Sequence, residues 1–154
     1  MPKQDDARQT ARYADMLAAM GTEPRLRILR LLLAAHPDRL DNRLELAESL
    51  SNRGQHGEAA ALLAAAPESQ QRSPELRRRR AVELYLDGDL VDGGALAREL
   101  FTEFPDNGSI RVLLATIEQA DGHWAAVLEL IGDAAERAPL QDQLNFLAVR
   151  ALER

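Results

Sequence analysis

Residues 73–88 read SPELRRRRAVELYLDG, and this stretch carries its own start and stop signals for a helix. Ser73 is a residue type that caps helix N-termini, and Pro74 suits the first helical turn because its ring presets the backbone. Gly88 suits the left-handed conformation in which many helices end. The stretch therefore predicts a helix over 74–86 that stops at a glycine turn.

The same signals return with a period of 34 residues on both sides of this stretch. Glycine, alanine and arginine each occur three times at this spacing, and proline occupies three of four slots in a further column. The columns are Gly54, Gly88 and Gly122; Ala47, Ala81 and Ala115; Arg43, Arg77 and Arg111; and Pro37, Gln71, Pro105 and Pro139. A fixed period of this length predicts a stack of equivalent supersecondary units.

Each period has the pattern helix, turn, helix, with apolar residues at helical spacing. The expected helices are 42–53, 59–66, 74–86, 94–104, 110–120 and 123–137, with a last helix at 141–152 and an earlier pair at 5–20 and 23–35. Asp92-Gly93-Gly94 suggests one extra residue before the second helix of the middle period.

The composition favours an all-α domain. The 154 residues include 26 alanines and 26 leucines but only 5 valines and 4 isoleucines, and β-branched residues are the ones that favour strands. No cysteine is present, which excludes disulfides and cysteine zinc sites. The net charge of −6 argues against a protein that coats nucleic acid.

The sequence lacks the short patterns that are typical of catalytic, cofactor-binding and targeting segments. It has no G-x-S-x-G, no G-x-x-x-x-G-K and no H-E-x-x-H pattern, so we expect a non-catalytic protein without cofactor or metal. The start is polar, and the longest apolar run, 59–66, is too short to cross a membrane. We expect a cytoplasmic protein, and the arginine-rich, lysine-poor composition suggests a bacterial one.

The repeated columns resemble the tetratricopeptide repeat (TPR) family over about residues 40–154. The resemblance implies an all-α, right-handed α-solenoid with three repeats, 40–73, 74–107 and 108–141, and a C-terminal capping helix at 142–154. The chain departs from the family pattern at Arg80, where the family and the other two repeats have leucine, and at Val127, where a small residue is expected.

The resemblance also implies a function, that of a protein-binding scaffold. TPR proteins bind a peptide or helix of a partner on the concave face that their first helices line. The positions of this chain that match that face are Asp41, Leu44, Glu48, Asn52, Arg78, Val82, Tyr85, Val112, Thr116 and Gln119.

Residues 1–39 allow a second interpretation. They can form a degenerate capping repeat, but 7–38, with RLRILRLLL at 25–33, also resemble the opening helices of ArsR-type winged-helix repressors, without the DNA-reading part. That resemblance implies a transcription regulator or anti-regulator that dimerises through its N-terminal helices. The role of the chain as a spacer also stays open. The joining of the two resemblances can be a natural fusion, an engineered chimera or a coincidence. The chain can be a monomer or a homodimer.

Overall fold

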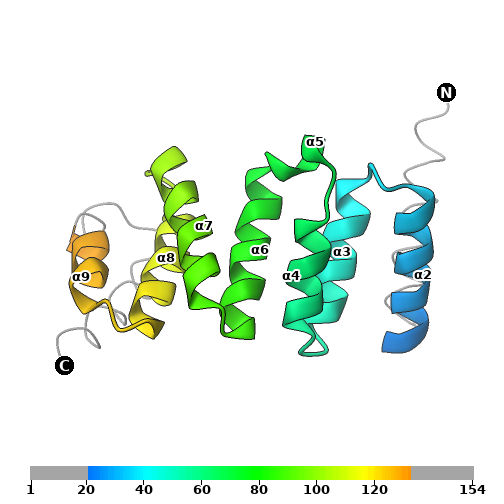
Figure 1. Ribbon diagram of the computed structural model, residues 1–154, viewed down its shortest axis with the longest axis horizontal. Helices are drawn as coiled ribbons and strands as arrows, with labels where there is room; N and C mark the ends of the chain where they lie inside the picture. Colours follow the sequence, from blue (N-terminus) through cyan, green and yellow to red (C-terminus); the bar gives the residue numbers. More distant parts are fainter. Residues whose placement is uncertain (1–20, 133–154) are drawn as a thin grey trace.

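The computed structural model of the chain describes residues 21–132, and these residues form a row of antiparallel α-helices without any strand (Figure 1). The helices are α2 (Thr22–Ala35), α3 (Leu40–Ser51), α4 (His56–Ala64), α5 (Glu68–Gln71), α6 (Pro74–Asp87), α7 (Leu90–Glu103), α8 (Gly108–Ala120) and α9 (Trp124–Gly132). The helices expected at 5–20 and 141–152, the capping segment 142–154 and the end of the helix expected at 123–137 lie outside the described residues.

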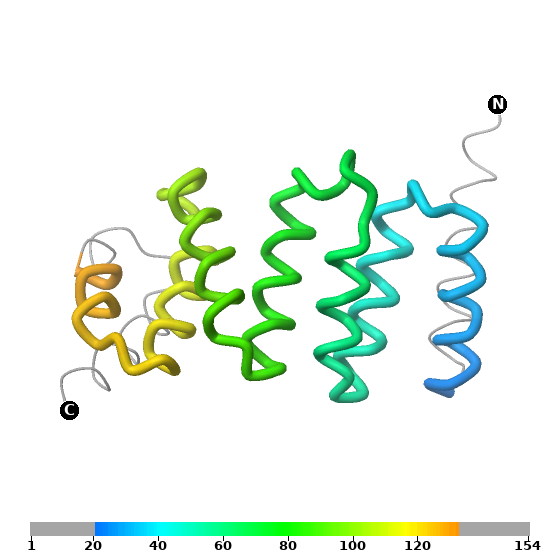
Figure 2. Tube along the Cα trace, in the orientation of Figure 1, coloured from blue at the N-terminus to red at the C-terminus, as the bar shows by residue number. Residues whose placement is uncertain are grey.

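The long helices pair as the sequence period predicts. Three pairs, α3 with α4, α6 with α7 and α8 with α9, form helix–turn–helix units, and α2 occupies the place of a preceding second helix. Each of these helices packs mainly on its neighbours along the chain, which gives the elongated row seen in Figure 2. The expectation of an all-α solenoid is confirmed.

The first helices of the pairs form the inner side of the row. Helix α6 contacts both α3 and α8 directly, whereas the second helices α4 and α7 have almost no direct contact with each other. A stack curves towards the side on which its helices lie closer together. We therefore call the surface of α3, α6 and α8 the inner face and the surface of α2, α4, α7 and α9 the outer face.

The predicted turns are confirmed by the backbone. Gly54, Gly88 and Gly122 have φ angles of 73°, 90° and 80°, which only glycine adopts without strain. The Ser73 hydroxyl accepts a hydrogen bond from the Leu76 N–H at the start of α6, as its position before a proline predicts.

Two expectations about the middle repeat are wrong. Helix α7 begins at Leu90 and not at residue 94, because the side chain of Asp89 accepts a hydrogen bond from the Asp92 N–H and caps the helix earlier. Helices α4, α7 and α9 begin at residues 56, 90 and 124, so the period of 34 holds and no residue is inserted. The short helix α5 was not expected at all.

The hydrophobic core runs along the row. Leu26 and Leu29 of α2 are buried together with Leu46 of α3, Leu63 of α4 and Leu76 of α6. Further along the row, two smaller clusters continue the core. The first contains Ala97, Leu114 and Ile117, and the second contains Ala115, Val127 and Ile131. Each helix pair thus buries its apolar side only against its neighbours.

The arginine column is part of the packing. Arg43 is buried and donates hydrogen bonds to the carbonyl oxygens of Leu62 at 3.0 Å and Pro37 at 3.4 Å. Two repeats later, Arg111 is also buried and donates to the Pro105 carbonyl at 2.8 Å. In the first and third repeats the arginine thus ties the first helix to the loop in front of it, whereas Arg77 of the middle repeat binds Glu99 and Glu103 of α7.

Candidate binding face

The ten residues expected to face a partner lie on the three helices of the inner face or directly after one of them. Four of them are exposed, namely Asp41, Glu48, Asn52 and Arg78, and six are half-buried, namely Leu44, Val82, Tyr85, Val112, Thr116 and Gln119. Because α6 contacts both α3 and α8, the helices bring these residues onto adjacent strips of one surface.

Several of the half-buried residues have structural contacts of their own. The Tyr85 ring packs against the cluster of Ala97, Leu114 and Ile117, so only part of it is open to a partner. The Thr116 hydroxyl donates a hydrogen bond to the Val112 carbonyl at 2.8 Å. These contacts hold the middle of the face in place.

The arginines at 77–80 on α6 differ in whether they form ion pairs. Arg77 binds Glu103 at 2.8 Å and Glu99 at 3.4 Å on the neighbouring helix α7. The hydrogen bond with Glu103 raises the pKa of the Arg77 guanidinium, and the same bond lowers the pKa of the Glu103 carboxyl. Arg78 is exposed and forms no ion pair within residues 21–132, so it is free to bind an acidic group.

A buried carboxylate lies behind this run. Glu83 is fully buried, with His56 Nδ1 2.9 Å from one carboxylate oxygen and Arg79 Nε 2.8 Å from the other. Ser51 Oγ also lies 3.3 Å from His56 Nδ1. A nucleophilic triad needs the hydroxyl and the acid on different ring nitrogens, so this Ser-His-Glu group does not have the geometry of a hydrolase site.

A second buried carboxylate, Glu118 on α8, is held in a similar way. Arg98 of α7 binds one of its oxygens at 2.7 Å and His123 Nδ1 lies 2.7 Å from the other. Neither carboxylate is recognisable from the sequence, because each depends on one partner from another helix, 27 residues away for Glu83 and 20 for Glu118. No three His, Cys, Asp or Glu side chains within 21–132 gather as a metal ion requires.

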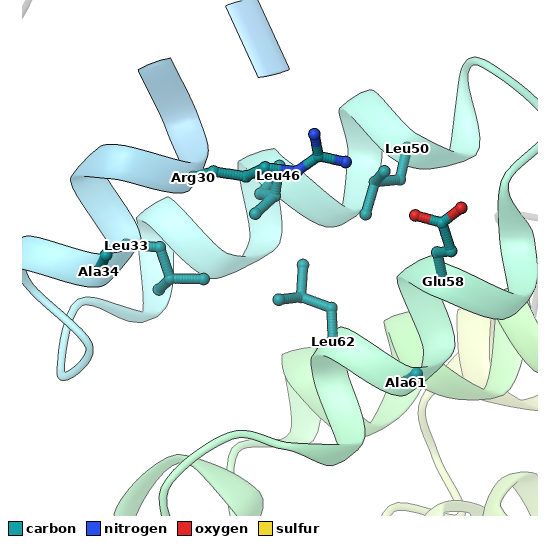
Figure 3. A pocket seen from close by; sticks show the side chains of 8 residues that line it. All are labelled: Arg30, Leu33, Ala34, Leu46, Leu50, Glu58, Ala61 and Leu62. Atoms are coloured by element: carbon teal, nitrogen blue, oxygen red, sulfur yellow. The ribbon is translucent and has the colours of Figure 1, made fainter. Parts of the chain in front are cut away.

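Two pockets lie on the outer face. One of about 490 Å³ is formed by α2, α3 and α4, and one of about 360 Å³ by α7, α8 and α9. The first is lined by Arg30, Leu33, Ala34, Leu46, Leu50, Glu58, Ala61 and Leu62 (Figure 3). The second is lined by Arg98, Phe101, Arg111, Leu114, Glu118, Ala126, Glu129 and Leu130. None of the ten inner-face residues lines either pocket.

The two pockets occupy equivalent places in the repeat. Arg98, Leu114 and Leu130 stand two periods after Arg30, Leu46 and Leu62. The repeat therefore forms a pocket between successive second helices at both ends of the described row. Among residues 21–132, no helix has the length and apolar character that crossing a bilayer requires.

The comparisons with known proteins agree with this fold. A family model described as tetratricopeptide repeat matches residues 26–81. The crystal structure of TTC0263, a thermophilic TPR protein in Thermus thermophilus, matches with a TM-score of 0.68 at 22% identity, over 86% of this chain and 74% of that one. The structure named MamA MSR-1 C2 matches with a TM-score of 0.61 at 17% identity, over 84% of this chain and 69% of that one. No curated protein matches the sequence.

These matches confirm a TPR-like α-solenoid, and the family match supports the resemblance over part of the predicted range. The matched residues begin at residue 26, inside the segment that resembles ArsR-type repressors. In the structure that segment includes α2, whose Leu26 and Leu29 belong to the same core as α3 and α4. No comparison tests the ArsR-type resemblance, which stays a prediction, as do the domain division at residue 39 and the cytoplasmic location.

Proposed function

We propose that this chain is a non-catalytic protein–protein interaction module that binds a peptide or helix of another protein on its inner face. The observation that carries the proposal is that α3, α6 and α8 align in a TPR-like solenoid and present exposed polar side chains between their packing contacts. An extended surface of this kind suits a peptide or helix.

The charges of the inner face support a partner of mixed charge. Arg78 stands free on α6, while the exposed carboxylates of Asp41 and Glu48 lie on the neighbouring helix α3. A partner with an acidic group opposite α6 and a basic group opposite α3 would complement this face. The half-buried ring of Tyr85 offers an apolar contact on α6, between the strips of α3 and α8.

The partner can be found by photo-crosslinking in cells. A photoreactive amino acid at position 78 samples the inner face, and one at Ala95, which is exposed on α7, samples the outer face. We expect position 78 to capture a protein that position 95 does not capture. Capture of the same proteins from both positions would contradict the assignment to the inner face.

The affinity of variants for the captured partner then tests whether Arg78 and Tyr85 contribute to binding. We expect Arg78→Glu together with Tyr85→Ala to lower the affinity by about tenfold or more, because a desolvated charge contact and an aromatic anchor are lost. Arg78→Glu alone, at an exposed position, keeps the fold and separates binding from stability. Arg72→Glu, an exposed charge reversal outside α6, is the matched control. Unchanged affinity in all variants would refute the inner-face site.

A further inference from the structure

The pocket between α2 and α4 combines an apolar floor with charged rims. Leu33, Leu46, Leu50 and Leu62 form the floor, and Figure 3 shows Leu50 and Leu62 between Arg30 on one side and Glu58 on the other. The pocket is an open hollow of about 490 Å³ on the surface. No candidate of the inner face takes part in it, so it is a separate surface.

Arg30 forms the basic rim of this pocket, and Arg27 lies one turn before it on α2. Arg27 and Arg30 are exposed neighbours one turn apart on α2, and neither forms an ion pair or hydrogen bond within the part of the chain that the structure describes. The acid on the same helix, Glu23, is already bound by Arg53 at 2.6 Å. Residues 1–39 carry a net charge of +2 and the rest of the chain −8, so positive charge is concentrated at this end.

The acidic rim is already satisfied. Glu58 accepts a hydrogen bond from Gln55 Nε2 at 2.8 Å. Beyond it, the exposed residues of α4 and its C-terminal end are the alanines Ala61, Ala64 and Ala65, which leave this wall smooth and uncharged. A partner therefore meets Arg30 on α2, leucines between the helices, and a wall on α4 that is apolar apart from Glu58.

The equivalent pocket between α7 and α9 differs in how its arginine is paired. There Glu118 takes the place of Leu50, and its carboxylate binds Arg98, the counterpart of Arg30, at 2.7 Å. Glu129 stands where the first pocket has Ala61, and Ala126 stands where the first pocket has Glu58, so each pocket has one exposed carboxylate on this wall. Arg98 thus has an ion pair within the chain, whereas Arg30 has none and interacts with Glu23 only electrostatically.

A third observation comes from the middle repeat. Arg80 replaces the leucine that lies at the floor of both pockets, and its Nε atom is buried without a hydrogen-bond partner. The middle repeat therefore has a polar side chain at the position where both pockets have an apolar one.

We propose that the pocket between α2 and α4 docks an acidic amphipathic helix of a partner protein. The apolar side of that helix lies on the leucine floor, and its carboxylates bind Arg27 and Arg30. This second site is independent of the inner face, so one chain can hold two proteins at once.

A designed helical peptide tests the proposal directly. The probe is a fluorescein-labelled peptide with leucines one turn apart and glutamates flanking them, and the matched peptide has lysines in place of the glutamates. We expect the glutamate peptide to bind about tenfold or more tightly than the lysine peptide. Arg30→Glu removes most of this preference, because the introduced carboxylate offsets the remaining charge of Arg27.

Two matched variants place the binding site on the chain. Ala61→Trp fills the pocket from its α4 wall and abolishes binding, whereas Ala95→Trp, the exposed counterpart one repeat later on α7, leaves it intact. Arg78→Glu on the inner face also leaves it intact, so failure of this proposal is distinguishable from failure of the proposed function. Urea unfolding of each variant confirms that the fold is kept. This is expected because positions 30, 61, 78 and 95 are all exposed.

Four results would overturn the proposal. These are equal affinity for both peptides, binding that Arg30→Glu does not change, no binding of the glutamate peptide at millimolar concentration, and loss of binding in Arg78→Glu. Self-association of the chain that Ala61→Trp removes would also overturn it, because a second copy would then be the occupant.

Discussion

The carboxyl group of Glu83 lies where the surrounding residues exclude water. Its side chain is 0% exposed, and its hydrogen bond to His56 joins α6 to α4. We expect Glu83→Gln to lower the free energy of unfolding by about 1–3 kcal/mol, because His56 and Arg79 lose their charged partner. The midpoint of urea unfolding measures this change.

Glu75 on the same helix provides the control for that measurement. It is exposed in the first turn of α6, so Glu75→Gln should change the free energy of unfolding by no more than about 0.5 kcal/mol. Equal midpoints for Glu83→Gln and the unchanged chain would show that the buried carboxylate contributes nothing to stability.

The candidate site could be predicted from the sequence only in part. Arg78 and Tyr85 were identified because the repeat period places them on the first helix of a pair. The contact between His56 and Glu83 was missed, because it joins residues 27 apart and both have ordinary local surroundings in the sequence. The outer pocket was missed for the same reason, since its leucines come from three different helices.

The ion pair of Arg77 and Glu103 predicts a dependence of stability on pH. The hydrogen bond from Arg77 lowers the pKa of the Glu103 carboxyl below its usual value. A lowered pKa in the folded state stabilises the fold above the ordinary glutamate pKa of about 4.3, and this contribution disappears as the pH falls through the lowered value.

We therefore expect Glu103→Gln to lower the melting temperature near pH 7 and to have no effect near about pH 2. Thermal unfolding followed by circular dichroism at both pH values measures this. Glu129→Gln on α9 is the control, because Glu129 has no ion-pair partner in the described residues. A difference between Glu103→Gln and the unchanged chain that persists in acid would contradict the assignment.

At the scale of the elements, the crossing of α6 and α7 depends on a glycine. A methyl group at Gly93 would lie 3.3 Å from the Ala81 carbonyl oxygen and 3.4 Å from the Tyr85 nitrogen, both backbone atoms of α6. At the adjacent Gly94 it would meet mainly the flexible end of Arg98 at 3.4 Å. The two glycines therefore have opposite tolerance to a side chain.

This difference gives a matched pair of substitutions. We expect Gly93→Val to lower the free energy of unfolding by about 1–3 kcal/mol, because α7 must move away from α6. We expect Gly94→Ala to raise it by up to about 1 kcal/mol, because alanine favours the helix. Chemical unfolding measures both, and a stabilising Gly93→Val would show that the two helices can separate without loss.

Helix boundaries were predictable wherever a local signal sets them. The glycines at 54, 88 and 122 end first helices in the structure as in the sequence pattern, because their positive φ angles are a property of single residues. The start of α7 was misplaced because two glycines in a row resemble a loop, whereas the Asp89 cap and the packing on α6 keep them helical. Tertiary contacts overrode local propensity there.

At the scale of the whole molecule, stability is distributed along a line. Leu76 belongs to the cluster shared by α2, α3, α4 and α6, whereas Val127 belongs to a cluster near α9 with Ala115 and Ile131. In a solenoid each repeat is stabilised by its own packing and that of its nearest neighbours, so damage at one interface weakens mainly the adjoining helices.

Hydrogen exchange followed by mass spectrometry distinguishes this behaviour from all-or-none unfolding. Leu76→Ala, at a fully buried position, should lower the free energy of unfolding by about 2–5 kcal/mol and speed amide exchange chiefly in α2, α3, α4 and α6. Val127→Ala should speed exchange chiefly in α8 and α9, because its cluster does not reach α3 or α4.

The outer pocket lies on α2, α3 and α4, so Leu76→Ala should also loosen its floor, and Val127→Ala should not. An equal rise in exchange over the whole of 21–132 in both variants would mean that the row unfolds as one cooperative unit and that its two ends are not energetically separate.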